Sequence, residues 1–158
     1  MATESTRVGV LALQGAFEEH RRCLEVLGVQ VQEVRLPEHL RGLDALLLPG
    51  GESTVMSKLL QRYQLLDPIR KRALEGMPLW GTCAGMILLA REVEGAIPEQ
   101  RGLGLMNLRV ERNAFGRQIE SCSLPLVLPW LGPEPFQAIF IRAPLALSLG
   151  GDLEVLAE

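Results

Sequence analysis

From residue 7 to residue 93 the sequence alternates short apolar runs with longer segments of helical periodicity, and this alternation constrains the fold more than any other feature. Strands are predicted at residues 7–13, 29–36, 43–48 and 78–81, and helices at residues 16–27, 54–66, 67–74 and 86–93. Short continuous apolar runs are typical of strands that are buried on both faces of a parallel sheet. We therefore predict an α/β fold with a mostly parallel central sheet and helices on both of its faces.

After residue 95 the pattern changes, because strand-like segments follow one another without helices between them. These segments are residues 103–113, 117–128, 136–144 and 153–158. Strands joined by short connections pair in antiparallel fashion, so we predict an antiparallel extension in the C-terminal part of the chain. The prolines between residues 124 and 135 predict a loop there. Since the extension has no helices of its own, we predict a single domain over residues 1–158.

The composition excludes several classes of function. The chain has 16 Lys and Arg against 19 Asp and Glu, so no basic excess indicates a nucleic-acid partner. No apolar run is long enough to span a membrane, and the polar start MATESTR does not resemble a signal peptide. Three cysteines and two histidines give neither a disulfide framework nor zinc-ligand spacing. We therefore expect a cytoplasmic, reduced protein without a metal, and no dinucleotide or P-loop motif predicts a cofactor.

Cys83 stands in the sequence Gly-Thr-Cys-Ala-Gly, between a predicted strand and a predicted helix. The pattern G-x-nucleophile-x-G forms a sharp turn that exposes its central residue, and the flanking glycines avoid a collision as the chain folds back. The alternative is that Cys83 is a small buried residue of the core. The other two cysteines have structural interpretations: Cys23 is predicted to pack on the apolar stripe of the first helix, and Cys122 lies in an alternating strand.

A second strand ends in a pair of glycines, in the sequence PGGEST at residues 49–54. Both turns would lie at the carboxyl edge of one parallel sheet, where open α/β sheets bind ligands. The backbone N–H groups of Gly51 and Ala84 could then form an oxyanion hole beside Cys83. The alternative is an ordinary strand-to-helix turn with a capping Ser53 or Thr54.

Five stretches in the same order resemble the glutaminase subunit of pyridoxal 5'-phosphate synthase, a triad-type glutamine amidotransferase family. They are LALQGAFEEH (11–20), PGGEST (49–54), GTCAG (81–85), RVERNAFGRQ (109–118) and FIRAP (140–144). The resemblance covers nearly the whole chain. GTCAG is shared with other amidotransferases, whereas RVERNAFGRQ and FIRAP are far more specific to this family.

The resemblance implies a flavodoxin-like, class I glutamine amidotransferase-like fold and hydrolysis of L-glutamine to glutamate and ammonia. It implies a thioester on Cys83, an oxyanion hole from Gly51 and Ala84, and substrate contacts from Gly51, Glu52, Ser53, Arg112, Ile141 and Arg142. An arginine suits the α-carboxylate of glutamine, although a surface ion pair is the alternative for Arg112 and Arg142. The partner implied is a barrel-shaped synthase subunit in a hetero-oligomeric complex that builds pyridoxal 5'-phosphate (vitamin B6), which is a product and not a cofactor of this chain.

A cysteine hydrolase normally needs a histidine that transfers protons. Of the two histidines, His39 is predicted in a solvated loop, and His20 is predicted to be a packed, hydrogen-bonded residue of the first helix. The alternative for His20 is a catalytic role, because its helix begins at the same carboxyl edge of the sheet. The family's triad histidine and glutamate lie in a His-Pro-Glu segment after the strand that here reads LEVLAE, and residues 1–158 contain no such segment. We therefore expect the 158-residue polypeptide to react at Cys83 but to release ammonia slowly. Ammonia release at a rate typical of amidotransferases would contradict this expectation.

Two other functions remain open at this stage. A flavodoxin-like cysteine peptidase or deglycase of the PfpI type also carries a cysteine at a strand-to-helix turn, which explains GTCAG but not PGGEST, RVERNAFGRQ and FIRAP together. A non-catalytic assembly subunit would keep the fold and the docking surface without activity. An assay with glutamine against one with a glycated peptide separates the enzymes.

Overall fold

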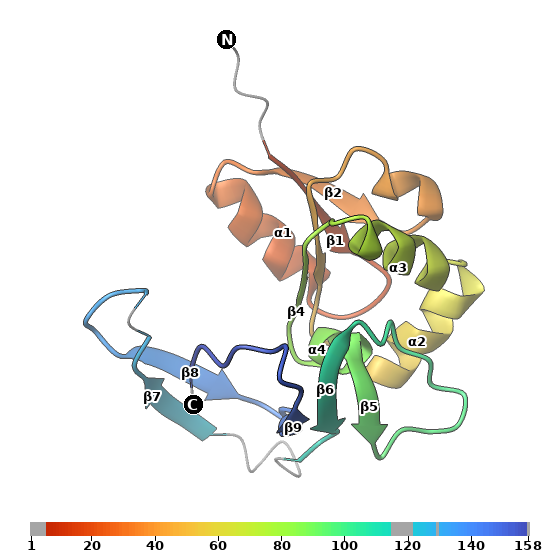
Figure 1. The fold of residues 1–158 in the computed structure, drawn as a ribbon. Helices are drawn as coiled ribbons and strands as arrows, with labels where there is room; N and C mark the ends of the chain where they lie inside the picture. The colour runs from red at the N-terminus through yellow and green to blue at the C-terminus, as the bar shows by residue number, and fades with distance from the viewer. Residues whose placement is uncertain (1–5, 115–121, 129, 158) are drawn as a thin grey trace.

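A computed structural model describes residues 6–114, 122–128 and 130–157. Its central sheet has four parallel strands in the order β2-β1-β3-β4 (Figure 1). The strands are β1 (Arg7–Leu11), β2 (Gln30–Val34), β3 (Ala45–Leu48) and β4 (Leu79–Gly81). All four lie within predicted strands, so the predicted parallel sheet is confirmed.

Helices cover both faces of this sheet, as the sequence predicts. They are α1 (Phe17–Val26), the short 3-10 helix η1 (Pro37–Leu40), α2 (Ser53–Arg62), α3 (Leu66–Leu74) and α4 (Ala84–Leu89). Helix α1 lies on one side of the sheet, and α2 and α3 lie on the other (Figure 1). The main core lies on the α2 and α3 side, where Leu46 and Leu48 of β3 pack in one cluster with Met56, Leu60 and Ile69. Burial of these side chains supplies the main driving force for folding.

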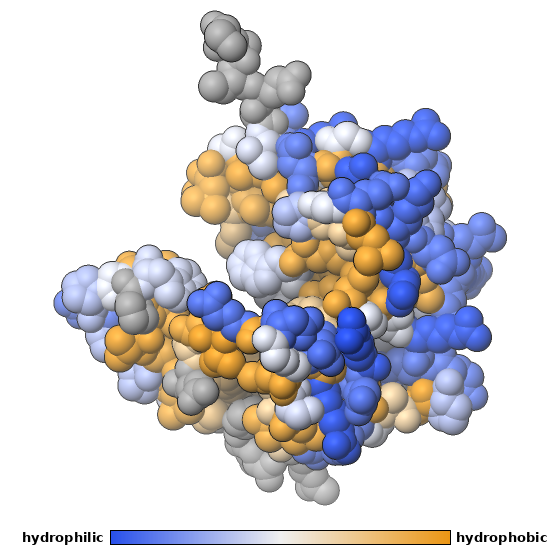
Figure 2. Space-filling view, in the orientation of Figure 1, coloured by the Kyte–Doolittle hydropathy of each residue, from blue (hydrophilic) through white to orange (hydrophobic). Residues whose placement is uncertain are grey.

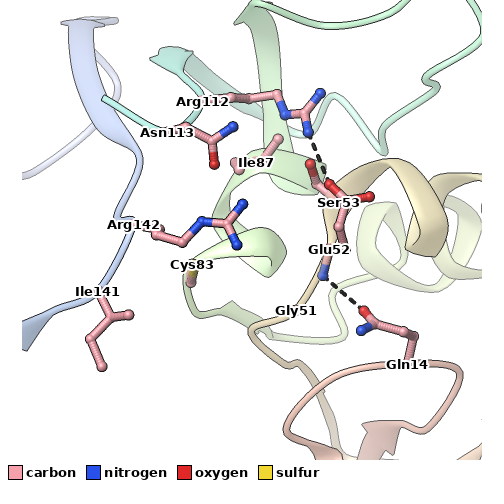
Figure 3. A pocket seen from close by; sticks show the side chains of 10 residues that line it. All are labelled: Gln14, Gly51, Glu52, Ser53, Cys83, Ile87, Arg112, Asn113, Ile141 and Arg142. Carbon is pink, nitrogen blue, oxygen red and sulfur yellow. Dashed lines mark hydrogen bonds and ion pairs between the residues drawn. The ribbon is translucent and has the colours of Figure 1, made fainter. Parts of the chain in front are cut away.

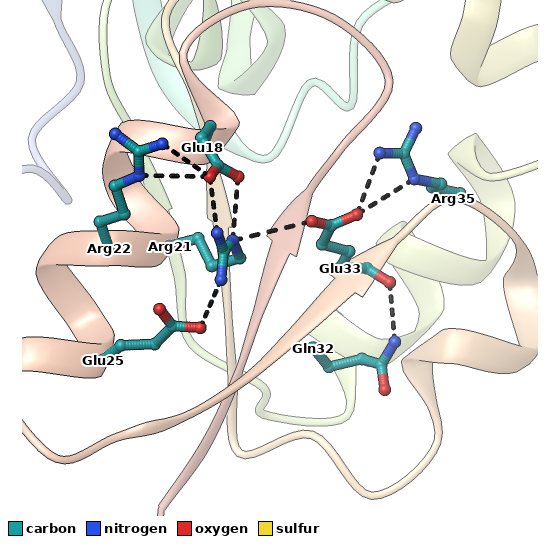
Figure 4. A network of polar contacts seen from close by, with 7 residues as sticks. All are labelled: Glu18, Arg21, Arg22, Glu25, Gln32, Glu33 and Arg35. Carbon is teal, nitrogen blue, oxygen red and sulfur yellow. Dashed lines mark hydrogen bonds and ion pairs between the residues drawn. The ribbon is translucent and has the colours of Figure 1, made fainter.

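Helix α1 is held to the sheet differently, because none of its residues is fully buried. Arg21 forms ion pairs with Glu18 and Glu25 of its own helix and with Glu33 of β2 (Figure 4). Cys23 is exposed, so the prediction that it packs on the apolar stripe of this helix is wrong. The side chains that face the sheet are only partly buried, and Cys23 lies off that face. Cys122 is half-buried in a strand, as predicted.

The C-terminal part forms two further small sheets. One contains β5 (Ala90–Glu94), β6 (Met106–Glu111) and β9 (Leu145–Leu149), and the other is the hairpin of β7 (Cys122–Leu126) and β8 (Phe136–Phe140). The β6–β9 and β7–β8 pairs are antiparallel, which confirms the predicted extension, whereas β5 pairs with β6 in parallel. Residues 115–121, which include the start of a predicted strand, lie outside the described residues.

Three local predictions in this part are wrong. The helix predicted at residues 86–93 ends at Leu89, because the chain turns into β5 and pairs with β6. Residues 153–157 are not a strand, and β9 forms instead at Leu145–Leu149. The proline-rich loop predicted from residue 124 begins only after β7. For the helix and the loop, strand pairing overrides local propensity.

The surface is uneven in character. Figure 2 shows hydrophilic side chains over the α2 and α3 side and apolar side chains around the β7–β8 hairpin. Among the exposed apolar residues are Ile139 of β8 and Trp80 of β4. No helix in the described part of the chain is long and apolar enough to cross a membrane.

Candidate active site

Cys83 lies at a sharp turn between β4 and α4. Its backbone has φ 49° and ψ −106°, a conformation that is unfavourable for a residue with a side chain. Hydrogen bonds hold the turn: Thr82 N donates to Leu48 O (3.1 Å), and Gly85 N donates to Thr82 O (2.8 Å). Such strained backbone persists only where the surroundings fix it, and it concentrates at functional sites. The exposed side chain excludes the interpretation of Cys83 as a buried core residue.

The two glycines that flank Cys83 are required by close backbone contacts. A Cβ atom on Gly81 would lie 2.5 Å from the carbonyl carbon of Gly85. A Cβ atom on Gly85 would lie 2.1 Å from the carbonyl oxygen of Leu48 in β3. The predicted reason for the glycine spacing is therefore confirmed: the chain folds back too tightly for side chains at these positions.

The predicted site residues come together around one cavity of about 370 Å³ (Figure 3). Its lining includes Cys83 and the predicted substrate-binding residues Gly51, Glu52, Ser53, Arg112, Ile141 and Arg142. Ala84 is buried directly after Cys83 at the start of α4. These residues come from four separate segments of the sequence, so only the fold brings them together.

The glycine turn after β3 lies beside Cys83. A Cβ atom on Gly50 would be 3.4 Å from the Cβ of Cys83, so the two turns are in contact. The loop after β1 fixes the glycine turn from the other side, because Ala16 N donates to Gly50 O (2.9 Å) and Glu52 N donates to the side-chain Oε1 of Gln14 (2.8 Å). The backbone around Gly51 is therefore held in place next to the sulfur atom.

Arg112 is an ion-pair partner of Glu52 in this structure. Its Nη2 lies 3.0 Å from Glu52 Oε1, and its Nη1 donates to Gln100 Oε1 (2.9 Å) and to Gly95 O (3.3 Å). The Arg112 side chain is only 11% exposed. Glu52 also caps α2, because its carboxylate accepts hydrogen bonds from Val55 N and Thr54 Oγ1. The ion-pair alternative for Arg112 thus holds, and the pair lies inside the cavity.

Arg142 is the second predicted arginine, and its environment differs. It is exposed and has a left-handed backbone with φ 47°. Figure 3 shows its side chain directed toward Cys83 and the cavity. Among the described residues, no hydrogen bond or ion pair engages its guanidinium group, so its donors are available to an anionic ligand. The ion-pair alternative for Arg142 finds no support in the described part of the chain.

Of the histidines, His20 lies next to the Cys83 turn. Its Nε2 is 3.2 Å from Thr82 Oγ1, and its ring meets Trp80 edge-on at 6.4 Å between ring centres. Burial lowers the pKa of His20 below its usual value, against the opposing effect of the Glu19 carboxylate, so the ring is neutral at pH 7. The prediction of a packed, hydrogen-bonded histidine is confirmed. His39 differs from the prediction of a solvated side chain. It is half-buried, and its Nδ1 accepts a hydrogen bond from Arg35 N (3.2 Å).

Three cavity residues were not predicted from the sequence: Gln14, Ile87 and Asn113. Gln14 could have been found, since it directly follows the first strand at the same sheet edge as the two glycine turns. Asn113 lies next to Arg112 in a family motif and has φ 53°. Ile87 reads as an ordinary core residue, and no sequence signal marks it as part of the site.

Cys83 also borders a second cavity, of about 620 Å³. Its lining is mostly apolar and includes Met86 of α4 and Ile139 of β8. The sulfur therefore lies between a polar and an apolar space. No group of three or more side chains able to hold a metal ion occurs in the described part of the chain.

Known proteins are similar to this chain in sequence and in fold. Residues 10–157 match the SNO glutamine amidotransferase family. The chain is 57% identical to the pyridoxal 5'-phosphate synthase subunit PdxT of Herpetosiphon aurantiacus, over 96% of this chain and 80% of that protein. It is 55% identical to the subunit of the same name from Pelotomaculum thermopropionicum, over 96% and 76%.

A solved structure agrees with these sequence relatives. The fold superposes on a crystal structure of a glutamine amidotransferase with a TM-score of 0.87 and 54% identity, over 95% of this chain and 78% of that one. Both the sequence and the fold lead to one conclusion: this chain belongs to the SNO glutamine amidotransferase family.

Proposed function

We propose that this chain hydrolyses the side-chain amide of L-glutamine at Cys83 and supplies the ammonia for synthesis of pyridoxal 5'-phosphate. One observation carries the proposal: an exposed cysteine on a strained turn shares a cavity with Glu52 and with Arg142, whose guanidinium group has no partner among the described residues. A free amino acid offers an ammonium group and a carboxylate, which are complementary to these two charges. The cavity volume of about 370 Å³ lies in the range of small-molecule sites.

The charges of Arg142 and Glu52 fix the orientation of the bound glutamine. The α-carboxylate of glutamine binds the guanidinium group of Arg142, and the α-ammonium group binds the carboxylate of Glu52. Arg112 holds that carboxylate in place from the side through the ion pair, rather than binding the substrate carboxylate itself. Ser53 and Ile141 contact the bound amino acid from the remaining walls. The side-chain amide then extends toward Cys83.

Hydrolysis proceeds in two steps at this site. The Cys83 thiolate forms a bond to the amide carbon, and the N–H groups of Gly51 and Ala84 stabilise the negative charge on the amide oxygen. The C–N bond then breaks as the nitrogen takes a proton from a solvent water molecule and leaves as ammonia, so a γ-glutamyl thioester remains on Cys83. Water adds to the thioester carbon and expels the thiolate, which releases glutamate.

The named relatives are subunits of a synthase, so the ammonia has a receiving partner. We propose that this partner is a barrel-shaped synthase subunit that forms a hetero-oligomeric complex with the chain. Direct transfer prevents ammonia from being protonated and lost in solution. The cytoplasm is the proposed compartment, in agreement with three free cysteines.

Arg142→Met tests the proposed orientation of glutamine. Bound glutamine should protect Cys83 from alkylation by iodoacetamide, and the glutamine concentration for half-protection measures binding. We expect the variant to raise this concentration about ten- to a hundredfold, because a hydrogen bond to a charged group is lost. Peptide mass spectrometry measures alkylation at Cys83 separately from the exposed Cys23.

Arg62→Met is the matched control, since Arg62 is exposed at the end of α2 and does not line the cavity. It should leave the glutamine concentration for half-protection unchanged. Asparagine is the ligand control, because its shorter side chain does not reach Cys83. Equal protection of the wild-type chain by glutamine and asparagine would contradict the proposed function.

A further inference from the structure

Gln100 connects two of the residues that line the glutamine cavity, although it does not line the cavity itself. Its Oε1 accepts a hydrogen bond from Arg112 Nη1 (2.9 Å), and its Nε2 donates to Ser53 Oγ (3.3 Å). Ser53 begins α2, and Arg112 follows β6, so the side chain bridges two separate elements.

The loop that carries Gln100 is fixed against α2. Ser57 of α2 is fully buried, and its Oγ donates to Arg101 O (2.8 Å) and accepts from Arg101 N (2.7 Å). Gln61, one turn later, donates to Glu99 O (3.2 Å). Since the residues on both sides of Gln100 are held, its backbone has little freedom, and its side chain is directed at Ser53 and Arg112.

The orientation of the Gln100 amide is determined by its partners. A guanidinium group has donors only, so the amide oxygen must face Arg112 and the amide nitrogen must face Ser53. Ser53 Oγ therefore acts as the acceptor in this contact. The hydroxyl hydrogen of Ser53 must then point elsewhere. Among the described residues it has no acceptor, although Ser53 is only 3% exposed and lines the cavity.

We propose that Gln100 is a positioning residue for substrate binding: it forces the Ser53 hydroxyl to act as a hydrogen-bond donor toward the carboxylate of the bound amino acid. This inference rests on the proposed function, because it needs glutamine in the cavity. It adds Gln100 to the residues that shape the site, and it assigns Ser53 as the donor in its hydrogen bond to the substrate. Arg142 and Ser53 both donate to the carboxylate, whereas Glu52 accepts from the ammonium group.

Gln100→Glu is the decisive variant, because it keeps the shape of the side chain and reverses the polarity at Ser53. Both carboxylate oxygens are acceptors, so the Ser53 hydroxyl turns to donate to residue 100 and is withdrawn from the substrate. We expect the glutamine concentration for half-protection of Cys83 to rise about tenfold or more. Gln100→Met changes the shape of the side chain but leaves the Ser53 hydroxyl free to donate. It should therefore raise the glutamine concentration for half-protection less than Gln100→Glu does.

Ser53→Ala separates action through Ser53 from other effects. It should raise the glutamine concentration for half-protection by a similar factor. Adding Gln100→Glu to Ser53→Ala should raise that concentration no further, since the hydroxyl is already absent. Gln30→Glu on β2 is the matched control, because Gln30 is exposed and outside the cavity. Thermal unfolding of each variant, measured in parallel, should stay within a few degrees of the wild-type midpoint.

The outcomes are distinct. If glutamine fails to protect wild-type Cys83, the proposed function and this inference both fail. If wild-type Cys83 is protected and Gln100→Glu is protected equally well, only the inference is overturned. The same holds if Gln100→Met costs more than Gln100→Glu, or if the effect of Gln100→Glu persists in full without the Ser53 hydroxyl.

Discussion

We expect the Cys83→Ala variant to lose covalent labelling by the glutamine analogue 6-diazo-5-oxo-L-norleucine. Labelling of the chain should fall by about a thousandfold or more, because no other residue can replace a missing nucleophile. The backbone turn should remain, since alanine fits the position at least as well as cysteine does. Intact mass spectrometry measures the label, and the small release of ammonia from glutamine should disappear with it.

Cys23→Ala is the matched control for this experiment. Cys23 is also an exposed thiol, but it lies on α1 and does not line the cavity. If labelling followed exposure alone, Cys23→Ala would reduce it as well. We expect labelling of Cys23→Ala to match that of the wild-type chain. Labelling that persists in Cys83→Ala would rule out Cys83 as the nucleophile.

Gly85→Ala should strongly destabilise the chain. An alanine Cβ would lie 2.1 Å from Leu48 O and 2.8 Å from the Leu48 carbonyl carbon, so α4 would have to move away from β3. We expect a loss of about 3 kcal/mol in the free energy of unfolding, as for severe overpacking. In an ordinary helix a Gly→Ala change raises the free energy of unfolding by about 1 kcal/mol. A decrease in that free energy would therefore indicate the close contact with β3. Urea unfolding measures it.

Gly151→Ala is the control for the glycine experiment, because a Cβ atom there meets no atom within 4 Å. Its free energy of unfolding should stay within about 0.5 kcal/mol of the wild-type value. The Gly85→Ala variant should also alkylate at Cys83 at a different rate, since the sulfur moves with the turn. A Gly85→Ala chain as stable as Gly151→Ala would show that the turn can relax and that the contact with β3 is not essential.

The first part of the fold was largely predictable because each signal is local. Val8, Val10 and Leu47 lie in apolar runs that only a buried strand explains, and Gly28 and Pro37 mark the ends of elements. Prediction failed where pairing with a distant strand decided the structure. Ala90 continues the helical pattern of α4, yet it starts β5 because β6 lies beside it.

The position of Cys83 beside the second glycine turn was predictable in the same way. Cys83 and Gly51 both follow buried strands, and the ends of parallel strands meet at one edge of a sheet. The pairing of Arg112 with Glu52 was not predictable, because 60 residues separate them in the chain. Neither were the contacts of Gln100 with Ser53 and Arg112, which lie 47 and 12 residues away in the sequence.

By itself the sequence determined the strand-to-helix turns, the place of Cys83 on one of them and the family, since these depend on backbone geometry and on short motifs. Only the tertiary structure decided which of the two arginines pairs with an acidic side chain. Arg112 and Arg142 are chemically identical and line the same cavity, and their difference arises because Arg112 folds against the carboxylate of Glu52, whereas Arg142 has no acidic partner among the described residues.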